Sequence, residues 1–326
     1  IVNSEISVIG VDGTGQRHLT DDPAPDGSPV WSPDGSTIAF SRWHNGQGGL
    51  FVMDADGTNL RQLTDFIGYG LRWSPDGQTI ALTGSILESG NPMQLPQIVI
   101  IATDGSGYQQ LTSAETMPIP AVSAGNSWPD WSPDGQQLTF VGDQVDGLSQ
   151  IYVIDQDGTN VRQLTDSPSR TSSPRWSADG AWIAFSADAA DADIWLVRPD
   201  GSDLQNLTAS PAIEVGMEWS PAGQQLAFVR QDDAGIQIVA IDADGSNERV
   251  LYESPDHVLS LSWSPAGDQI VFARGNLGST SDLYLLTVAD GTIQQLTDAP
   301  TSELDPDWSP DGTRIVYTTD YGETYK

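Results

Sequence analysis

Short runs of apolar residues recur along the whole chain, each followed by glycine, proline and aspartate. Examples are the runs LFVM at residues 50–53 and IYVI at residues 151–154. Runs of four to six β-branched and aromatic residues between turn residues are typical of β-strands. The pattern predicts an all-β protein and excludes helical repeats.

Seven Trp-Ser pairs divide the chain into repeats. Successive tryptophans lie 42 to 45 residues apart, except for a gap of 58 residues between the second and the third. This period matches the roughly 40–50 residues of a four-stranded propeller blade. The tryptophans that start the predicted blades are Trp31, Trp73, Trp131, Trp176, Trp219, Trp263 and Trp308.

Each repeat is expected to contain four strands: one ending at the tryptophan, one after a Ser-Pro-Asp-Gly turn, one before an Asp-Gly pair and one at Gln-Leu-Thr. Proline sets φ at the second position of a type I turn, and glycine is favoured at the fourth. Asp-Gly is a strong hairpin signal. Alanine replaces the turn proline at Ala178 and the turn aspartate at Ala222 and Ala266.

The two ends of the chain complement each other. Residues 1–22 contain only the third- and fourth-strand patterns, and the 19 residues from Trp308 onward contain only the first two. Together they make one blade. We therefore expect a seven-bladed β-propeller over residues 1–326, in one domain, closed by a blade that the N- and C-termini share.

Composition changes this picture mainly through charge. The chain has 13 Lys and Arg against 45 Asp and Glu, a net charge of −32, and no cysteine. Such acidity disfavours nucleic acid and anionic lipid as partners. The longest aliphatic run, residues 98–102, is far too short for membrane insertion. Much of the acidity is turn aspartate, which accounts for it without a binding site.

The blade 1 string WSPDG, followed by IAF, FVMDADGTN and RQLTD, resembles the repeat of TolB-like propellers, and the match recurs along the chain. The resemblance implies a periplasmic or extracellular bacterial protein. It favours a non-catalytic scaffold that binds a protein or peptide. The alternative is a carbohydrate-active or hydrolytic enzyme, or its propeller domain, because such enzymes resemble this fold too.

The residue before each tryptophan is expected to line the central channel. Five of these residues are charged, and two neighbouring couples, Arg72 with Asp130 and Arg175 with Glu218, suggest ion pairs between blades. The tryptophans themselves are expected to pack between blades as spacers. The charged channel residues are Arg72, Asp130, Arg175, Glu218 and Asp307.

Insertions distinguish blade 2. Its loops around residues 88–96 and 116–127 are longer than those of blade 1 and carry apolar residues. Either these loops fold over and bury themselves, or they form a docking patch for a protein or peptide. The candidate binding residues are Trp43, His44, Met93, Leu95, Met117, Ile119 and Trp128.

No cofactor is indicated firmly. The best metal candidates are Asp188, Asp191 and Asp193 in one loop, where calcium is one interpretation and a solvated loop the other. Catalysis has little support, because no Gly-x-Ser-x-Gly motif is present and the three histidines are dispersed. The sequence thus favours a non-enzymatic role.

Overall fold

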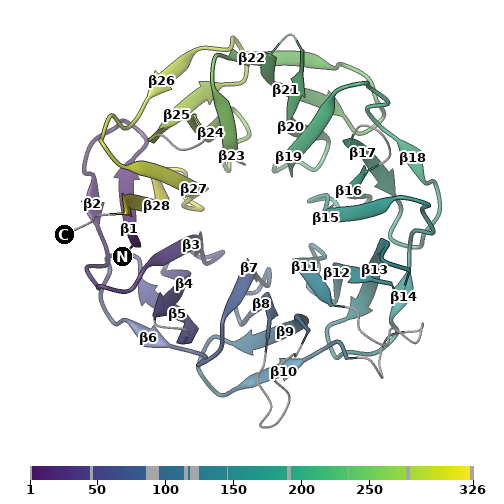
Figure 1. The fold of residues 1–326 in the computed structure, drawn as a ribbon, viewed down its shortest axis with the longest axis horizontal. Coiled ribbons are helices and arrows are strands. Elements are labelled where there is room, and N and C mark those ends of the chain that lie inside the picture. Colours follow the sequence, from purple (N-terminus) through teal and green to yellow (C-terminus); the bar gives the residue numbers. More distant parts are fainter. Residues whose placement is uncertain are drawn as a thin grey trace.

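The computed structural model describes residues 2–44, 47–85, 95–113, 117, 125–144, 146–188, 192–233, 235–276 and 280–323. Seven four-stranded antiparallel sheets form a ring, with one strand of each sheet at the centre (Figure 1). The predicted seven-bladed propeller is confirmed. None of the described residues forms a helix that could span a membrane.

Each blade runs from an inner strand that ends at the repeat tryptophan to a short outer strand. The strands of blades 1 to 3 are β3 (Asp26–Trp31), β4 (Thr37–His44), β5 (Gln47–Asp54), β6 (Arg61–Gln62), β7 (Gly68–Trp73), β8 (Thr79–Gly84), β9 (Gln97–Ala102), β10 (Tyr108–Gln110), β11 (Asn126–Trp131), β12 (Gln137–Asp143), β13 (Ser149–Asp155) and β14 (Arg162–Gln163). Those of blades 4 to 6 are β15 (Arg170–Trp176), β16 (Ile183–Asp188), β17 (Ala192–Val197), β18 (Gln205–Asn206), β19 (Ile213–Trp219), β20 (Gln225–Asp232), β21 (Gly235–Asp242), β22 (Arg249–Ser254), β23 (His257–Trp263), β24 (Gln269–Gly275), β25 (Ser281–Thr287) and β26 (Ile293–Gln295).

Blade 7 is built from both ends of the chain, as the half-repeats predict. It comprises β27 (Ser302–Trp308), β28 (Arg314–Glu323), β1 (Val2–Gly10) and β2 (Arg17–His18), in the order β2-β1-β28-β27. The closing ladder joins β1 to β28 and pairs Ser7 with Tyr317 at its centre. The two ends therefore lie close together in the ring (Figure 1).

One face of the ring carries the Ser-Pro-Asp-Gly and Asp-Gly turns, and we call it the turn face. In blade 1 the Ser32 hydroxyl donates to Asp34 Oδ1 at 2.6 Å, and the backbone N–H of Ser36 donates to the same oxygen at 3.0 Å. Gly35 has φ +69°, and its Cβ position lies 3.4 Å from Cδ of Pro310 in blade 7. Glycine is required here because this conformation disfavours a side chain.

Tryptophans join neighbouring blades on the inner side of the ring. At five joints the indole Nε1–H of one blade's tryptophan donates to a backbone carbonyl of the preceding blade. The acceptor is the residue directly before that blade's own tryptophan, as where Trp73 donates to Val30 at 3.2 Å. At the other two joints Asp130 and Asp307 accept the backbone N–H of Trp176 and Trp31, each at 2.8 Å. The indole nitrogens of those two tryptophans have no hydrogen-bond partner.

The opposite face carries the connections between the second and third strands and the crossovers between blades, and we call it the loop face. Here the threonine of Gln-Leu-Thr fastens the crossover: Thr20 Oγ1 accepts the N–H of Ile6 at 2.9 Å and donates to Glu5 at 2.6 Å. In five other blades the hydroxyl of the equivalent threonine accepts a backbone N–H of the third strand. These threonines are Thr64, Thr112, Thr165, Thr208 and Thr297. Blade 5 has no such threonine, and its outer strand β22 is six residues long.

Candidate functional site

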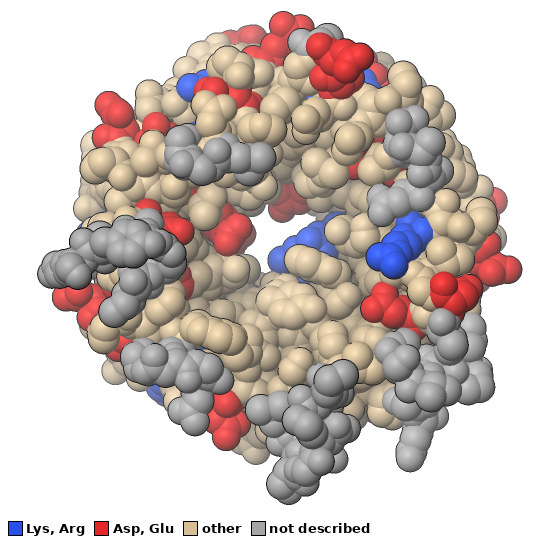
Figure 2. All heavy atoms as spheres, in the orientation of Figure 1, with Lys and Arg blue, Asp and Glu red and all other residues tan. Residues whose placement is uncertain are grey.

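The inner strands surround a central cavity of about 960 Å³. Its opening is visible at the middle of the ring, with basic atoms on one side and acidic atoms on another (Figure 2). All five charged residues that the sequence places in the channel line this cavity: Arg72, Asp130, Arg175, Glu218 and Asp307.

The charges are not distributed evenly around the channel. The Arg72 guanidinium contacts Asp130 at 3.3 Å, so the ion pair predicted between blades 2 and 3 forms. The pair predicted between Arg175 and Glu218 is wrong, because no contact within 4.0 Å joins these two described residues. The Arg175 guanidinium donates instead to the Pro174 carbonyl at 3.0 Å.

For both groups, burial outweighs the attraction between their charges. Burial lowers the pKa of Arg175 to about 10, and the nearby charge of Arg72 adds to the fall. Burial raises the pKa of Glu218 to about 8, and repulsion from Asp307 adds to the rise. Burial also raises the pKa of Asp307 to about 6. A carboxyl group with its pKa near neutrality is unusual and marks a candidate functional position.

Apolar side chains border the channel toward the loop face. Four of them lie three or four residues before the blade tryptophan, and each exposes 41% to 43% of its surface. Three of the four also line the cavity. We call this set the apolar rim: Tyr69, Trp128, Val215 and Leu259.

Trp128 is the most unusual member of the rim. Its φ is +57°, at a bulge where other blades have serine, glycine or aspartate. Its N–H donates to Thr83 Oγ1 at 2.9 Å, and its ring packs edge-on against Tyr69 with centroids 5.6 Å apart. A bulky residue in the left-handed region costs free energy, and such strain is concentrated at functional sites.

The other predicted docking residues do not gather at the rim. Trp43 is exposed at the end of β4, and Leu95 is exposed before β9. Met117 is half-buried and packs against the core of blades 2 and 3, where its Cε lies 3.0 Å from the Cβ position of Gly142. At Met117 the chain thus folds inward. His44 pairs with Gln47 in a hairpin, while Met93 and Ile119 lie outside the described residues.

The calcium interpretation gains no support from the residues that can be described. Asp193 accepts hydrogen bonds from the Asn206 amide at 2.7 Å and the Ser210 N–H at 3.1 Å. Asp188 ends β16, and Asp191 lies outside the described residues. The described part of the chain holds no group of three or more acidic or histidine side chains arranged for a metal.

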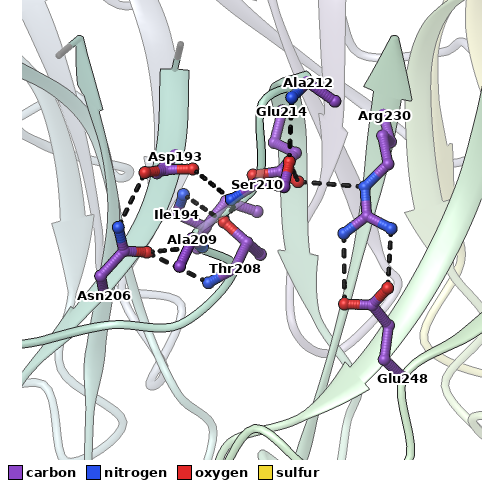
Figure 3. Close-up of polar contacts among 10 residues, drawn as sticks. All are labelled: Asp193, Ile194, Asn206, Thr208, Ala209, Ser210, Ala212, Glu214, Arg230 and Glu248. Carbon is purple, nitrogen blue, oxygen red and sulfur yellow. Dashed lines mark hydrogen bonds and ion pairs between the residues drawn. The ribbon is translucent and has the colours of Figure 1, made fainter. Parts of the chain in front are cut away.

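Beside Asp193, a second acidic cluster holds the crossover into blade 5 (Figure 3). Glu214 is fully buried, accepts the hydroxyls of Thr208 and Ser210, and pairs with Arg230 at 3.0 Å. Arg230 also contacts the exposed Glu248 at 2.7 Å. Every group here has a partner within the protein, so this network is structural.

Sequence reasoning missed Tyr69, Leu259 and Ser260, which the structure adds to the channel. They lie at equivalent inner-strand positions, three or four residues before Trp73 or Trp263. Counting back from each tryptophan would have revealed them.

Comparison with known proteins agrees with this architecture. The family model described as TolB beta propeller domain matches residues 108–280. The Tol-Pal system protein TolB of Gluconobacter oxydans is 36% identical over 108 residues, which are 33% of this chain and 22% of that protein. The chain spans less than two thirds of the length of the curated relatives it matches.

Solved structures of enzymes share the fold. An oligogalacturonate lyase from Vibrio parahaemolyticus has a TM-score of 0.75 and 15% identity, over 100% of this chain and 98% of that one. A puromycin-hydrolyzing peptidase of Mycobacterium tuberculosis has a TM-score of 0.69 and 16% identity, over 89% of this chain and 50% of that one. Such low identities show the fold alone. Because the family model covers more than half of the 326 residues and the repeats close into seven blades, the chain belongs to the TolB β-propeller domain family.

Proposed function

We propose that this propeller is a non-catalytic scaffold that binds a protein or peptide at the loop-face mouth of its channel. The observation that carries the proposal is Trp128, an exposed tryptophan held at φ +57° beside the cavity. Keeping it there costs conformational free energy, and 41% of its surface stays exposed. Recognition of a partner accounts for both features.

The rest of the apolar rim supports this role. Tyr69 and Leu259 both line the cavity and both expose about two fifths of their surface, which is unusual for apolar side chains that no partner covers.

 Exposed apolar patches next to a hollow mark interaction sites, and aromatic residues are enriched at the core of protein interfaces. The mouth also adjoins the charged channel, so one partner could contact Tyr69, Leu259 and the channel wall together.

Family membership supports the location we propose. TolB homologues are periplasmic. On the strength of this resemblance we place the chain in the periplasm or outside the cell of a bacterium. The partner is then a protein or peptide of that compartment.

Selection of a random peptide library on the immobilised protein tests the proposal. We expect selected peptides to bind Trp128→Ala at least about tenfold more weakly than the unmodified protein, in line with loss of an interface tryptophan. Leu204→Ala is the control, because Leu204 is exposed to a similar extent, 48% against 41% for Trp128, but lies before the outer strand β18. Equal binding to the two variants, or no enrichment of any peptide, would contradict the proposal.

One observation favours a second candidate function, cleavage of a carbohydrate. The pKa of Glu218 is raised to about 8, as a general acid requires, and aromatic rings lie at the same cavity. Oligogalacturonate is the substrate to test, because a lyase of similar fold acts on it. Cleavage products that appear with the unmodified protein and disappear with Glu218→Gln would support this candidate over the scaffold.

A further inference from the structure

The channel wall has two unlike sectors. In the sector formed by β7, β11 and β15, Arg72 and Arg175 accompany Asp130. In the sector formed by β19, β23 and β27, the charged side chains that line the cavity are Glu218, Asp305 and Asp307, all acidic. Among the described residues of this second sector no basic side chain lines the cavity.

Two polar atoms of the acidic sector have no partner. Glu218 Oε2 and Ser260 Oγ are both buried and make no hydrogen bond. They belong to the neighbouring inner strands β19 and β23 and line the same cavity. Buried polar atoms are almost always hydrogen-bonded, so two unsatisfied oxygens in one channel wall point to a ligand with polar groups.

We infer that the partner inserts a basic side chain, arginine or lysine, into the acidic sector of the channel, where it contacts Glu218, Ser260 and Asp307. The inference rests on the proposed function and names the chemistry of its partner. A guanidinium or ammonium group supplies donors and no acceptors, which suits the ionised Glu218 carboxylate, and the Ser260 hydroxyl can accept from the same group.

The apolar rim fits the rest of such a side chain. Arginine and lysine carry long apolar stems that pack on hydrophobic surface while the charged group reaches a polar one. Leu259 lines the cavity from β23, within the acidic sector, whereas Tyr69 and Trp128 line it from β7 and β11. The net charge of −32 also draws a basic partner toward the protein over a longer range.

Binding should depend on pH. The charged groups that line the cavity with Glu218 are Arg72 on β7, Asp130 on β11, Arg175 on β15, and Asp305 and Asp307 on β27. Of these, Asp307 raises the pKa of Glu218, and the two arginines lower it without offsetting burial. A basic side chain binds the ionised form, so affinity should increase as pH rises from about 6 to about 9, a range in which arginine stays charged.

The same random peptide library, selected on three proteins, tests the inference. On the unmodified protein we expect arginine and lysine to be enriched severalfold beside an aromatic or aliphatic residue. On Glu218→Gln we expect the basic enrichment to fall while the apolar preference remains. Glu248→Gln is the matched control, since it removes one charge at an exposed position outside the channel and should leave both preferences intact.

A second measurement uses one selected peptide and its twin with uncharged citrulline in place of arginine. We expect the unmodified protein to bind the arginine peptide about tenfold more tightly, with a preference that grows with pH and is lost in Glu218→Gln and reduced in Asp307→Asn. Equal affinity for both peptides overturns the inference and leaves the proposed function standing. Loss of peptide binding altogether overturns both.

A divalent metal ion is the other occupant of the acidic sector that the experiments must distinguish from a basic side chain. If calcium alone raises the melting temperature of the unmodified protein, and Glu218→Gln removes that rise, the acidic sector holds a divalent cation and the inference is overturned.

Discussion

The two faces of the ring use acidic residues in opposite ways. On the turn face, each Asp-Gly aspartate accepts hydrogen bonds from the residue two positions later, and its pKa is lowered in all seven blades, at Asp12, Asp56, Asp104, Asp157, Asp200, Asp244 and Asp290. On the loop face, buried carboxylates such as Glu214 and Glu303 fasten crossovers between blades. The first kind stabilises one turn, whereas the second holds separate elements together.

This difference explains why charge alone does not locate a site. Asp311 on the turn face has its pKa lowered to about 2 by the hydroxyls of Ser309 and Thr313. Glu303 on the loop face has its pKa raised to about 7 because burial outweighs its hydrogen bonds. The proposed partner site rests instead on an unsatisfied oxygen, and among the buried carboxylates of the described residues Glu218 has one.

The largest effect should come from breaking the loop-face network of Figure 3. Glu214→Ala leaves the hydroxyls of Thr208 and Ser210 without their acceptor and removes the buried partner of Arg230. We expect a loss of about 3 kcal/mol in the free energy of unfolding, measured by urea denaturation. Glu248→Ala, at the exposed end of the same arginine, should cost less than about 1 kcal/mol. Equal losses would contradict the contrast between buried and exposed partners.

The next effect concerns the channel carboxylate. The pKa of Glu218 is about 8 in the folded protein against 4.5 for an ordinary glutamate, so the folded state keeps a proton that the unfolded chain releases between these values. Stability from this group is therefore present at low pH and lost as pH rises through that window. Between about pH 5 and 8.5 the unmodified protein should lose on the order of 2 kcal/mol more than Glu218→Gln. Parallel stability curves for the two proteins would show that Glu218 ionises normally.

A turn-face aspartate should show the opposite dependence. The lowered pKa of Asp311 contributes stability that is present above its ordinary value of 3.8 and is lost as pH falls toward 2. Because Asp311 is exposed, we expect Asp311→Ala to cost only about 1 kcal/mol at neutral pH. Thermal unfolding should show the difference between variant and parent shrinking in acid; a difference that widens there would be inconsistent with this assignment.

The smallest effect comes from restoring a missing turn carboxylate. Alanine stands at position 222, where most repeats have aspartate, and the Ser220 hydroxyl has no such acceptor. Ala222→Asp should raise the free energy of unfolding by about 0.5 kcal/mol. Ala266→Asp is the control, because Ser264 already donates to Asp268 at 2.9 Å and should gain nothing. Equal gains at both positions would point to a general effect of added charge.

The fold could be predicted closely because short local sequence patterns determine each blade. The tryptophan spacing, the Ser-Pro-Asp-Gly turn and the half-repeats at the ends each act within one blade, and all three predictions are confirmed. The long outer strand β22 was not anticipated, since it depends on the absence of Gln-Leu-Thr in blade 5.

The site was harder to predict because it depends on distances between blades. The position directly before each tryptophan was enough to place Glu218 and Asp307 on the channel. It did not show that Arg175 lies beyond ion-pair distance of Glu218. No local signal marks Tyr69, because its contact with Trp128 joins two blades. Which oxygen lacks a partner is a property of packing, and no sequence pattern encodes it.

The shared seventh blade also bears on how the molecule folds. Ser7 and Tyr317 must meet across almost the whole chain, and bringing such distant residues together costs about 5 kcal/mol in loop-closure entropy. Contacts this remote in sequence form slowly. Blades 1 to 6 consist of contiguous segments that can form early, so the β1–β28 ladder is expected to form last. Until it does, the open ring leaves the flanks of blades 1 and 6 bare, and this stage is the one most exposed to aggregation.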